Sequence, residues 1–311
     1  MRGIRRGRPG RAGDAVIVTG ASTGIGLETA LTLARAGFRV FAGVRNPDQS
    51  EELRAGASER GVSLQVIELD ITDRTSIENA VATTVAQAGG IFGLVNNAGI
   101  GLRGCTEDCA EEEIRQLFET NVLGTIAVTR AVIPHMRRAG CGRLVTVSSV
   151  GGRVCGFGVT MYCATKFAQE GLGEGLAQEL APFGIQSVIV EPGIIKTTRW
   201  SRHRGTAARA NEPDSPYHEL FWASEAIADK LVERSPTRPE HVAHAIEQAL
   251  TVSHPPMRYV VGRGARVVIG VRRYLPETLF ERLYFGGHIR RLGRRTKATG
   301  ATPSPKTETA R

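Results

Sequence analysis

The sequence lacks any long apolar run. None of its apolar runs approaches the roughly 18 residues of a membrane-spanning helix, and ARVVIGV near the C-terminal end is among the longest. The basic N-terminus, MRGIRRGRPGRAGD, also lacks the apolar region of a secretory signal peptide. We therefore expect a soluble, cytoplasmic protein.

Cysteines are few and irregularly spaced. The 311 residues include five cysteines, an odd number, and no CxxC pair. A disulfide framework or a zinc site needs regular spacing and partner ligands, and no histidine near Cys105 and Cys109 completes a metal-binding set. We expect free thiols and predict no metal site.

The body of the chain has little positive charge. The formal net charge is +9, but residues 1–13 contribute +5 and residues 258–311 contribute +10, which leaves −6 for residues 14–257. A nucleic-acid-binding protein usually carries its basic residues across a folded face. Nucleic-acid binding through the basic ends is therefore the weakest functional hypothesis, and we expect no nucleic-acid partner.

Short apolar runs alternate with longer segments of helical periodicity between residues 14 and 261. Strands that alternate with helices indicate right-handed βαβ units and a parallel sheet covered on both faces. The sequence predicts one α/β domain over residues 14–289, Rossmann-type and doubly wound, with a mostly parallel seven-stranded sheet. The predicted strands are 15–20, 38–44, 63–70, 91–99, 142–149, 185–193 and 258–262, and a helix at about 25–36 follows the first of them.

Four segments stand apart from this alternation. Residues 1–13 and 290–311 are basic and are expected to be disordered. Residues 196–226 are polar and interrupted by prolines, which is typical of a mobile substrate lid. The aromatic side chains of this lid either line an apolar pocket or only pack the lid down. These aromatic residues are Trp200, Tyr217, Phe221 and Trp222.

The C-terminal extension, residues 262–289, contains an amphipathic helical pattern after Pro276. Its apolar face has three interpretations: packing on its own domain or a second subunit, a flap on the substrate mouth, or weak membrane-surface contact. The first is preferred. The apolar face consists of Leu275, Leu279, Phe280, Leu283 and Tyr284, and the arginines that would assist membrane contact are 290, 291, 294 and 295.

A glycine-rich turn joins the first predicted strand to the first predicted helix. In TGASTGIG, Gly20 permits a sharp turn, Gly24 lets the backbone approach a pyrophosphate, and Gly26 allows close packing of helix on strand. The helix N-terminus offers unpaired N–H groups and a positive dipole end to phosphate. The turn therefore predicts a dinucleotide cofactor.

The second predicted strand ends in a cation rather than an acid. Sites that prefer NAD place an acid here to bind the ribose 2′-hydroxyl, whereas this chain has Arg45. Arg45 is suited to pair with a 2′-phosphate, helped by the hydroxyl of Ser22 or Thr23. The alternative is a solvated surface arginine. We predict a preference for NADP(H) over NAD(H).

Tyr162 and Lys166 are four residues apart, so a helix places them on one face. A tyrosine pKa of about 10 makes a poor base at neutral pH, but a nearby ammonium lowers that pKa. Ser149, at the end of the fifth predicted strand, can polarise a substrate carbonyl. Only one of Ser149 and its neighbour Ser148 can face the crevice, because strand side chains alternate. Alone, the Tyr–Lys pair is also typical of an ordinary amphipathic turn.

Seven motifs occur in a fixed order: TGASTGIG, LDIT, NNAG, TNVLG, VSSVGG, YCATK and EPGIIKTT. In this order they resemble the short-chain dehydrogenase/reductase family, over roughly residues 14–200. The resemblance implies that Tyr162 is the catalytic acid/base, Lys166 its electrostatic and ribose-binding partner, and Ser149 the group that orients the carbonyl. It also implies that Asn121 anchors a water in a proton relay behind Lys166.

The resemblance also implies contacts with the cofactor. Asp70 would bind the adenine amino group, and Asn97 with Gly99 would border the adenosine. The end of the sixth strand would hold the nicotinamide amide. The expected cofactor-binding residues are Gly20, Ser22, Thr23, Gly24, Ile25, Gly26, Arg45, Asp70, Ile71, Asn97, Ala98, Gly99, Tyr162, Lys166, Pro192, Gly193, Ile195 and Thr197.

Within the family, the chain is most similar to the branch of hydroxysteroid and retinol dehydrogenases. That similarity implies a small hydrophobic alcohol or ketone as substrate, steroid-, retinoid- or lipid-like, and a homodimer or homotetramer. Two alternatives stay open: a general carbonyl reductase of small or acyl substrates, and a non-catalytic NADP(H)-sensing regulator.

Overall fold

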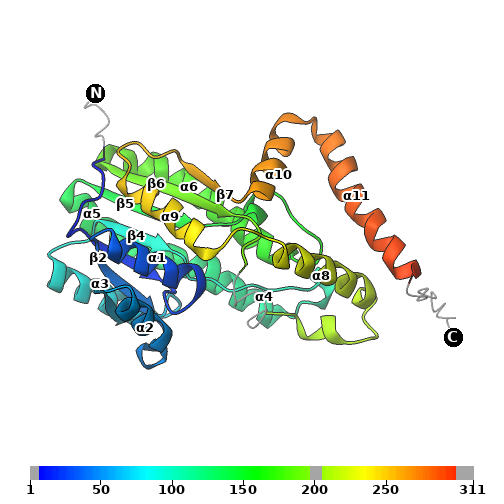
Figure 1. Ribbon diagram of the computed structural model, residues 1–311, viewed down its shortest axis with the longest axis horizontal. Helices are drawn as coiled ribbons and strands as arrows, with labels where there is room; N and C mark the ends of the chain where they lie inside the picture. The colour runs from blue at the N-terminus through cyan, green and yellow to red at the C-terminus, as the bar shows by residue number, and fades with distance from the viewer. Residues whose placement is uncertain (1–6, 197–204, 299–311) are drawn as a thin grey trace.

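A seven-stranded, all-parallel sheet forms the centre of the protein (Figure 1). The computed structural model describes residues 7–196 and 205–298, with the side chains of residues 263 and 288–298 excepted. The order of the strands is β3-β2-β1-β4-β5-β6-β7. The strands are β1 (Ala15–Thr19), β2 (Arg39–Val44), β3 (Gln65–Glu68), β4 (Gly93–Asn96), β5 (Gly142–Val147), β6 (Ile185–Pro192) and β7 (Arg258–Val261).

Each of the seven strands falls inside a predicted apolar run, so the predicted fold is confirmed. The order of the strands reverses between β1 and β4, which are direct neighbours. In an open α/β sheet, ligands bind outside the carboxyl ends of the strands at such a reversal. The fold therefore places the glycine turn after β1 beside the segment after β4.

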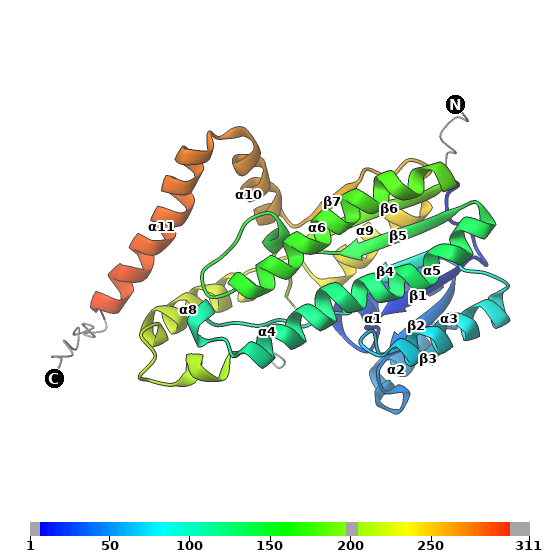
Figure 2. The same ribbon diagram turned by 180° about the vertical axis from the view of Figure 1, so that it is seen from behind.

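Helices cover both faces of the sheet. The first face carries α1 (Gly24–Arg35), α2 (Glu51–Glu59) and α9 (Pro239–Thr251), and it faces the viewer in Figure 1. The second face carries α3 (Arg74–Ala88), α5 (Thr125–Ala139) and α6 (Thr160–Leu180), and it faces the viewer in Figure 2. The short helix α4 (Glu111–Phe118) continues into α5 through a π-helical turn at Glu119–Gly124.

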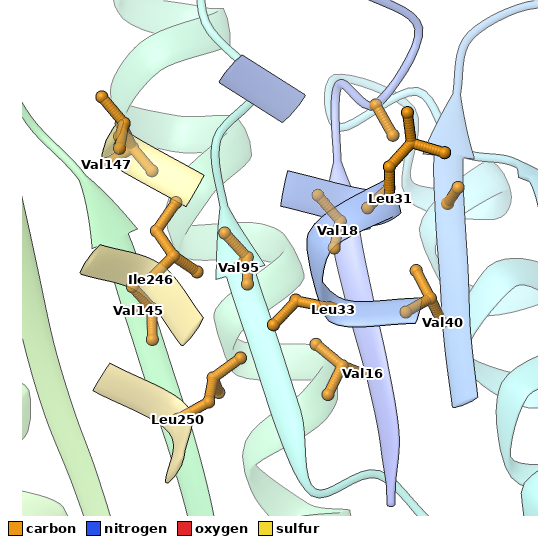
Figure 3. Packing of buried hydrophobic residues seen from close by; sticks show 14 of the residues in the cluster. Val16, Val18, Leu31, Leu33, Val40, Val95, Val145, Val147, Ile246 and Leu250 are labelled. Carbon is orange, nitrogen blue, oxygen red and sulfur yellow. The ribbon is translucent and has the colours of Figure 1, made fainter. Parts of the chain in front are cut away.

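Alternation along β1 divides the core into two layers. Val16 and Val18 pack under α1 and α9, while Ile17 packs on the opposite face with the residues of α3, α5 and α6. Figure 3 shows the first layer, in which strand valines meet Leu33 of α1 and Ile246 of α9. The strands are apolar on both faces because both faces are covered.

The N-terminal segment is ordered where the structure describes it. Arg8 makes an ion pair with Asp14 at 2.6 Å, and its guanidinium lies 4.6 Å from the centre of the Phe92 ring. The Gly10 amide donates to the carbonyl of Leu250 at 2.8 Å. The expectation of disorder is therefore wrong for residues 7–13, because Arg8 finds a carboxylate and an aromatic face on the folded body.

The C-terminal extension forms two helices, α10 (Arg263–Tyr274) and α11 (Glu277–Ala298), which project from the body as a hairpin (Figures 1 and 2). Residues 290–298 are helical, which corrects the expectation that the tail is disordered from residue 290. The first proline of the tail is Pro303, so residues 290–298 contain no proline that would interrupt the helix. No helix in the described part of the chain is both long and apolar enough to cross a membrane.

Candidate active site

The glycine turn after β1 adopts the conformation that its glycines permit. Gly20 and Gly24 have φ angles of +65° and +59°, a region that favours glycine. A Cβ on Gly26 would lie 2.1 Å from the Gly20 carbonyl oxygen, so α1 packs closer to the turn than any side chain allows. A Cβ on Gly24 would meet nothing within 4 Å. Open space therefore adjoins the first residue of α1, as a phosphate-binding turn requires.

Asn97 holds this turn in place from the adjacent strand end. Its side-chain amide donates to the carbonyls of Thr19 at 2.9 Å and Gly20 at 3.1 Å. The Thr19 hydroxyl in turn accepts from the backbone amides of Asn97 and Ala98 at 3.0 and 2.9 Å. Asn97 thus fixes the two strand ends to each other. The other expected residues here, Ser22, Thr23, Ile25 and Gly99, are partly buried.

The ends of β2 and β3 carry the residues expected near the adenosine. Arg45 follows β2 directly and is exposed. One carboxylate oxygen of Asp70 accepts from both the amide and the hydroxyl of Thr72, at 2.9 and 2.7 Å. Ile71 is buried. The turn after β3 is therefore held by Asp70 itself.

Ser149 and Tyr162 converge on the space beside Gly151. A Cβ on Gly151 would lie 3.4 Å from Ser149 Oγ and 3.5 Å from Tyr162 Cε1. Ser149 follows β5 and accepts a hydrogen bond from the Gly151 amide at 3.0 Å, whereas Ser148 is buried. Tyr162 lies in the first turn of α6. Cys163 Sγ lies 3.3 Å from the same point, so three side chains surround Gly151 closely, and the Ser149 hydroxyl and the Tyr162 ring are neighbours.

Lys166 lies one turn after Tyr162 and is 6% exposed. Its ammonium donates to the Val147 carbonyl at 3.0 Å and to Gln169 Oε1 at 2.9 Å. The Nζ atom is 5.7 Å from the centre of the Tyr162 ring. The structure therefore brings the tyrosine and the ammonium to one face of α6.

Asn121 lies in the π-helical turn between α4 and α5 and is fully buried. Its side chain accepts from the Ile100 amide at 2.8 Å and donates to the Ile100 carbonyl at 2.9 Å. Its amide also donates to the Thr165 hydroxyl at 3.1 Å. Asn121 therefore ties the segment after β4 to α6, one residue before Lys166.

The end of β6 carries the residues expected near the nicotinamide. The Gly193 amide donates to the Val261 carbonyl at 2.9 Å, and a Cβ on Gly193 would lie 2.9 Å from that of Ala265 in α10. Pro192 and Ile195 are buried. Thr197 and Trp200 lie outside the described residues.

The family described as short chain dehydrogenase matches residues 14–207. The chain belongs to this short-chain dehydrogenase/reductase family. Members of the family are oxidoreductases that act on CH–OH groups, and they use NAD(P)(H). The predicted family and the predicted enzyme class are both confirmed.

Curated relatives of this short-chain dehydrogenase/reductase extend over most of its length. The uncharacterized oxidoreductase YusZ of Bacillus subtilis is 39% identical over 85% of this chain and 95% of its own. Retinol dehydrogenase 5 of Mus musculus is 36% identical over 85% of this chain and 86% of its own. The 17-beta-hydroxysteroid dehydrogenase type 1 of Homo sapiens is 34% identical over 78% of this chain and 76% of its own. The hydroxysteroid and retinol dehydrogenase branch is thus confirmed as the similar one.

Solved structures agree with the fold. A short-chain dehydrogenase from Streptomyces avermitilis gives a TM-score of 0.73 at 34% identity, over 89% of this chain and 98% of that one. A variant of actinorhodin polyketide ketoreductase, solved with NADPH, gives a TM-score of 0.69 at 30% identity, over 81% of this chain and 97% of that one.

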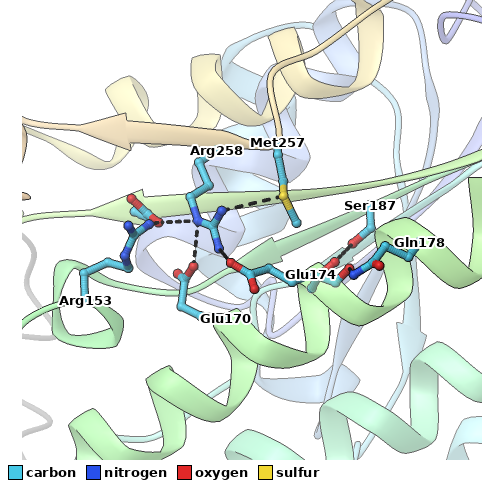
Figure 4. Close-up of polar contacts among 9 residues, drawn as sticks. Arg153, Glu170, Glu174, Gln178, Ser187, Met257 and Arg258 are labelled. Atoms are coloured by element: carbon cyan, nitrogen blue, oxygen red, sulfur yellow. Dashed lines mark hydrogen bonds and ion pairs between the residues drawn. The ribbon is translucent and has the colours of Figure 1, made fainter. Parts of the chain in front are cut away.

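Two features of this short-chain dehydrogenase/reductase were not predicted from its sequence. The first is Gln169, which lies between Lys166 and Asn121. The second is a buried ionic cluster on β6, β7 and α6, centred on Arg258 (Figure 4). Arg258 pairs there with Glu170, Glu174 and Glu191. The spacing of Lys166 and Gln169, three residues apart on one helix, is the only signal that could have indicated the first feature.

The lid aromatics of the enzyme have separate roles. Phe221 is fully buried, and it packs with Leu102, Leu117 and Met161, the last of which lies in α6. The Tyr217 hydroxyl donates to Glu107 at 2.9 Å, and the indole of Trp222 donates to the Ala210 carbonyl at 3.2 Å. These contacts hold the described part of the lid down. The lid also contains a regular helix, α8 (His218–Glu233), against which α11 packs.

Cys163 follows Tyr162 in α6, and Cys155 lies beside Cys163. A hydrogen bond from the Cys163 thiol holds the pKa of Cys155 below its ordinary value and raises that of Cys163. Burial raises the pKa of Tyr284 of α11, and both thiols lie near enough to act on it as well. No cluster of potential metal ligands occurs among the described residues.

Proposed function

We propose that this protein is an NADP(H)-dependent oxidoreductase that interconverts a hydroxyl and a carbonyl on a hydrophobic substrate. The observation that carries the proposal is the proximity of Ser149 Oγ to the Tyr162 ring, both within 3.5 Å of a Cβ placed on Gly151, with the Lys166 ammonium 5.7 Å from the tyrosine ring. A carbonyl oxygen bound between Ser149 and Tyr162 would meet a hydroxyl donor and an acid/base together.

Each residue has a distinct part in the reaction. The Ser149 hydroxyl donates to the substrate oxygen and orients the carbonyl. Tyr162 gives its proton to that oxygen in reduction and takes it back in oxidation. Lys166 favours the phenolate of Tyr162 by its positive charge and binds the nicotinamide ribose. The nicotinamide, when bound, supplies or accepts the hydride.

The turn after β1 and the end of β6 fit such a cofactor. Open space lies where a Cβ of Gly24 would point, at the N-terminus of a 12-residue helix. Arg45, exposed at the end of β2 where no acid lies, favours a 2′-phosphate. The polyketide ketoreductase among the similar structures was solved with NADPH. We expect Arg45→Asp to lower the NADPH-to-NADH ratio of kcat/KM, and an unchanged ratio would contradict the preference for NADP(H).

The substrate class rests on the apolar groove of the α10–α11 hairpin. Its lining is entirely apolar or aromatic, and the charge of Cys163, which follows Tyr162 in α6, contributes to the raised pKa of Tyr284. Two relatives are named for retinol and for a hydroxysteroid. The hairpin is suited to act as a flap on the substrate mouth. The lining residues are Val267, Val268, Val271, Leu275, Phe280, Leu283 and Tyr284.

The test is an NADPH- and NADH-linked screen over all-trans-retinal, a 17-ketosteroid, 3-ketodihydrosphingosine and simple aliphatic ketones. Reduction of the hydrophobic members is expected, with activity lost in Tyr162→Phe and kept in Tyr274→Phe, whose ring is 79% exposed. Normal turnover by Tyr162→Phe would refute the mechanism. Cofactor binding without turnover of any substrate would favour the alternative function, a non-catalytic NADP(H)-sensing regulator.

We further propose that the enzyme is a cytoplasmic homodimer or homotetramer. The side chains of Leu279 and Phe285 on the hairpin are apolar, exposed and outside the groove, so they suit contact with a second copy of the chain. Light scattering should give a dimer or a tetramer that Leu279→Arg weakens. A monomer that instead binds vesicles of anionic phospholipid would favour membrane-surface contact over assembly.

A further inference from the structure

The side chain of Gln169 links the catalytic lysine to the backbone of Asn121. Gln169 is 1% exposed. Its Oε1 accepts from Lys166 Nζ at 2.9 Å, and its Nε2 donates to the Asn121 carbonyl at 2.7 Å. The Thr125 hydroxyl lies 3.4 Å from the same nitrogen.

The chemistry of the two partners fixes the orientation of this carboxamide. An ammonium only donates hydrogen bonds, and a carbonyl only accepts them. Exchanging Oε1 and Nε2 would set a donor against Lys166 and an acceptor against Asn121. The Asn121 end is itself rigid, because its side chain is paired with both backbone groups of Ile100. Gln169 therefore adopts only one orientation between two fixed points.

The first consequence concerns the position of the ammonium. Lysine has a long flexible side chain and three donors. Two of these donors are committed to the Val147 carbonyl and to Gln169, one from the end of β5 and one from α6 itself. The lysine is thus anchored by two acceptors other than its tyrosine, with its Nζ atom 5.7 Å from the centre of the Tyr162 ring.

The second consequence concerns the Asn121 carbonyl. Its oxygen accepts from Gln169 Nε2 at 2.7 Å and from the Thr125 hydroxyl at 2.9 Å. A carbonyl oxygen has two lone pairs, so both are taken. The family resemblance implied a relay water between this residue and Lys166. A carboxamide in that place has no proton that dissociates near neutral pH, so it cannot pass one on as a water does.

We propose that Gln169 is a positioning residue that replaces the relay water: its carboxamide anchors Lys166 beside Tyr162 and closes the route from the ammonium to the Asn121 carbonyl. The inference rests on the proposed function, since it assigns Lys166 a part in the reaction.

Two variants separate this role from simple packing. Gln169→Met keeps the volume of the side chain but removes both hydrogen bonds. Gln169→Ala leaves a space with three polar partners for a water, namely Lys166 Nζ, the Asn121 carbonyl and the Thr125 hydroxyl, which is enough to hold one. Gln178→Met is the matched control, because Gln178 is exposed on the same helix and bonds only within it, to the Glu174 carbonyl.

The anchoring role predicts that Gln169→Met impairs the enzyme more than Gln169→Ala does. In alcohol oxidation, Gln169→Met should raise the apparent pKa of the alkaline-activated limb of kcat/KM by about one unit, the low end of what a displaced neighbouring charge produces. It should also weaken NADPH binding by about tenfold, the effect of losing one hydrogen bond from a charged donor. Gln169→Ala, whose space a water can fill, should change both quantities less than Gln169→Met does, and Gln178→Met should leave both close to those of the unaltered protein.

A packing role predicts the opposite order, because a cavity destabilises more than a volume-conserving change. If Gln169→Ala is the more impaired variant, or if Gln169→Met lowers only the melting temperature and leaves the pH profile unchanged, the proposal is overturned. If the unaltered protein binds NADPH but turns over no substrate, the proposed function fails. The NADPH affinities of the two variants then still test the anchoring of Lys166.

Discussion

Arg258 neutralises a buried group of carboxylates, and its removal should destabilise the protein in a pH-dependent way. Its Nε lies 3.0 Å from Glu170 and 3.1 Å from Glu191, and its Nη2 pairs with Glu174 (Figure 4). The side chains of Glu170 and Glu191 are 8% and 0% exposed. Arg258→Met keeps the apolar stem but leaves these carboxylates facing each other.

The expected cost follows from burial. Removing one partner of a buried ion pair costs about 3–5 kcal/mol, because the other charge stays buried without compensation. Arg258 itself is 22% exposed, and Arg153 still pairs with Glu191 at 2.9 Å. We therefore expect a loss at the low end, about 3 kcal/mol in the free energy of unfolding at pH 8.

The loss should shrink as the pH falls. Burial, together with the charge of Glu191, raises the pKa of Glu170, while Arg258 opposes the rise. Without Arg258 the folded-state pKa rises further above the unfolded value. A carboxyl group with a raised folded-state pKa stabilises the fold fully below its unfolded pKa, and that stability is lost as the pH rises through the folded pKa. At pH 5 the variant should therefore lose less stability than at pH 8.

Urea unfolding at both pH values checks this prediction, with Arg74→Met as the control. Arg74 pairs with Glu78 on the surface, with side chains 91% and 60% exposed, so its variant should unfold at an unchanged midpoint. A loss for Arg258→Met that is equal at the two pH values, or larger at pH 5, would refute the electrostatic account.

Three further experiments, two with variants and one with the unaltered protein, test separate parts of the structure. Gly26→Ala should abolish NADPH binding, because its Cβ would lie 2.1 Å from a backbone oxygen, while Gly171→Ala, whose Cβ meets nothing within 4 Å, should keep it in the same titration. Phe221→Ala should cost about 3–5 kcal/mol in urea unfolding, since Phe221 is 0% exposed; an equal loss in Phe183→Ala, 40% exposed, would contradict this. Iodoacetamide at pH 7.5 should alkylate Cys155 before Cys105, whose pKa is raised to about 11 chiefly by burial, and peptide mass spectrometry showing the reverse order would count against the thiol–thiol hydrogen bond.

The fold could be predicted because its signals are local. Each strand is a short apolar run, and helical periodicity between the runs leaves few other arrangements. The ends were mispredicted because their order depends on distant partners. Arg8 looks like part of a basic tail until the fold brings Phe92 beneath it. Likewise, the composition of residues 290–311 hid the helical conformation of residues 290–298.

The motif residues of the site were also predictable, because the glycine turn and the Tyr162–Lys166 spacing lie within single elements. Their partners were not. Gln169 meets the Asn121 carbonyl across 48 residues of sequence, and Arg258 meets Glu170 across 88. Glutamine or glutamate on a helix is ordinarily a solvated residue. Only the packing of α6 against the π-helical turn and the end of the sheet turns these residues into buried partners.

The two unpredicted features bear on one element, α6. Tyr162, Lys166 and Gln169 follow each other at i, i+4 and i+7, so they form one stripe of the helix, which carries the candidate site residues. Glu170 and Glu174 form an adjacent stripe, which faces Arg258 of β7. A helix held on one stripe alone could still roll about its axis and carry the tyrosine away from Ser149. Because Gln169 fixes one stripe to the π-helical turn and Arg258 fixes the other to the sheet edge, both rotations are opposed, and the position of Tyr162 is set by contacts on two sides of its helix.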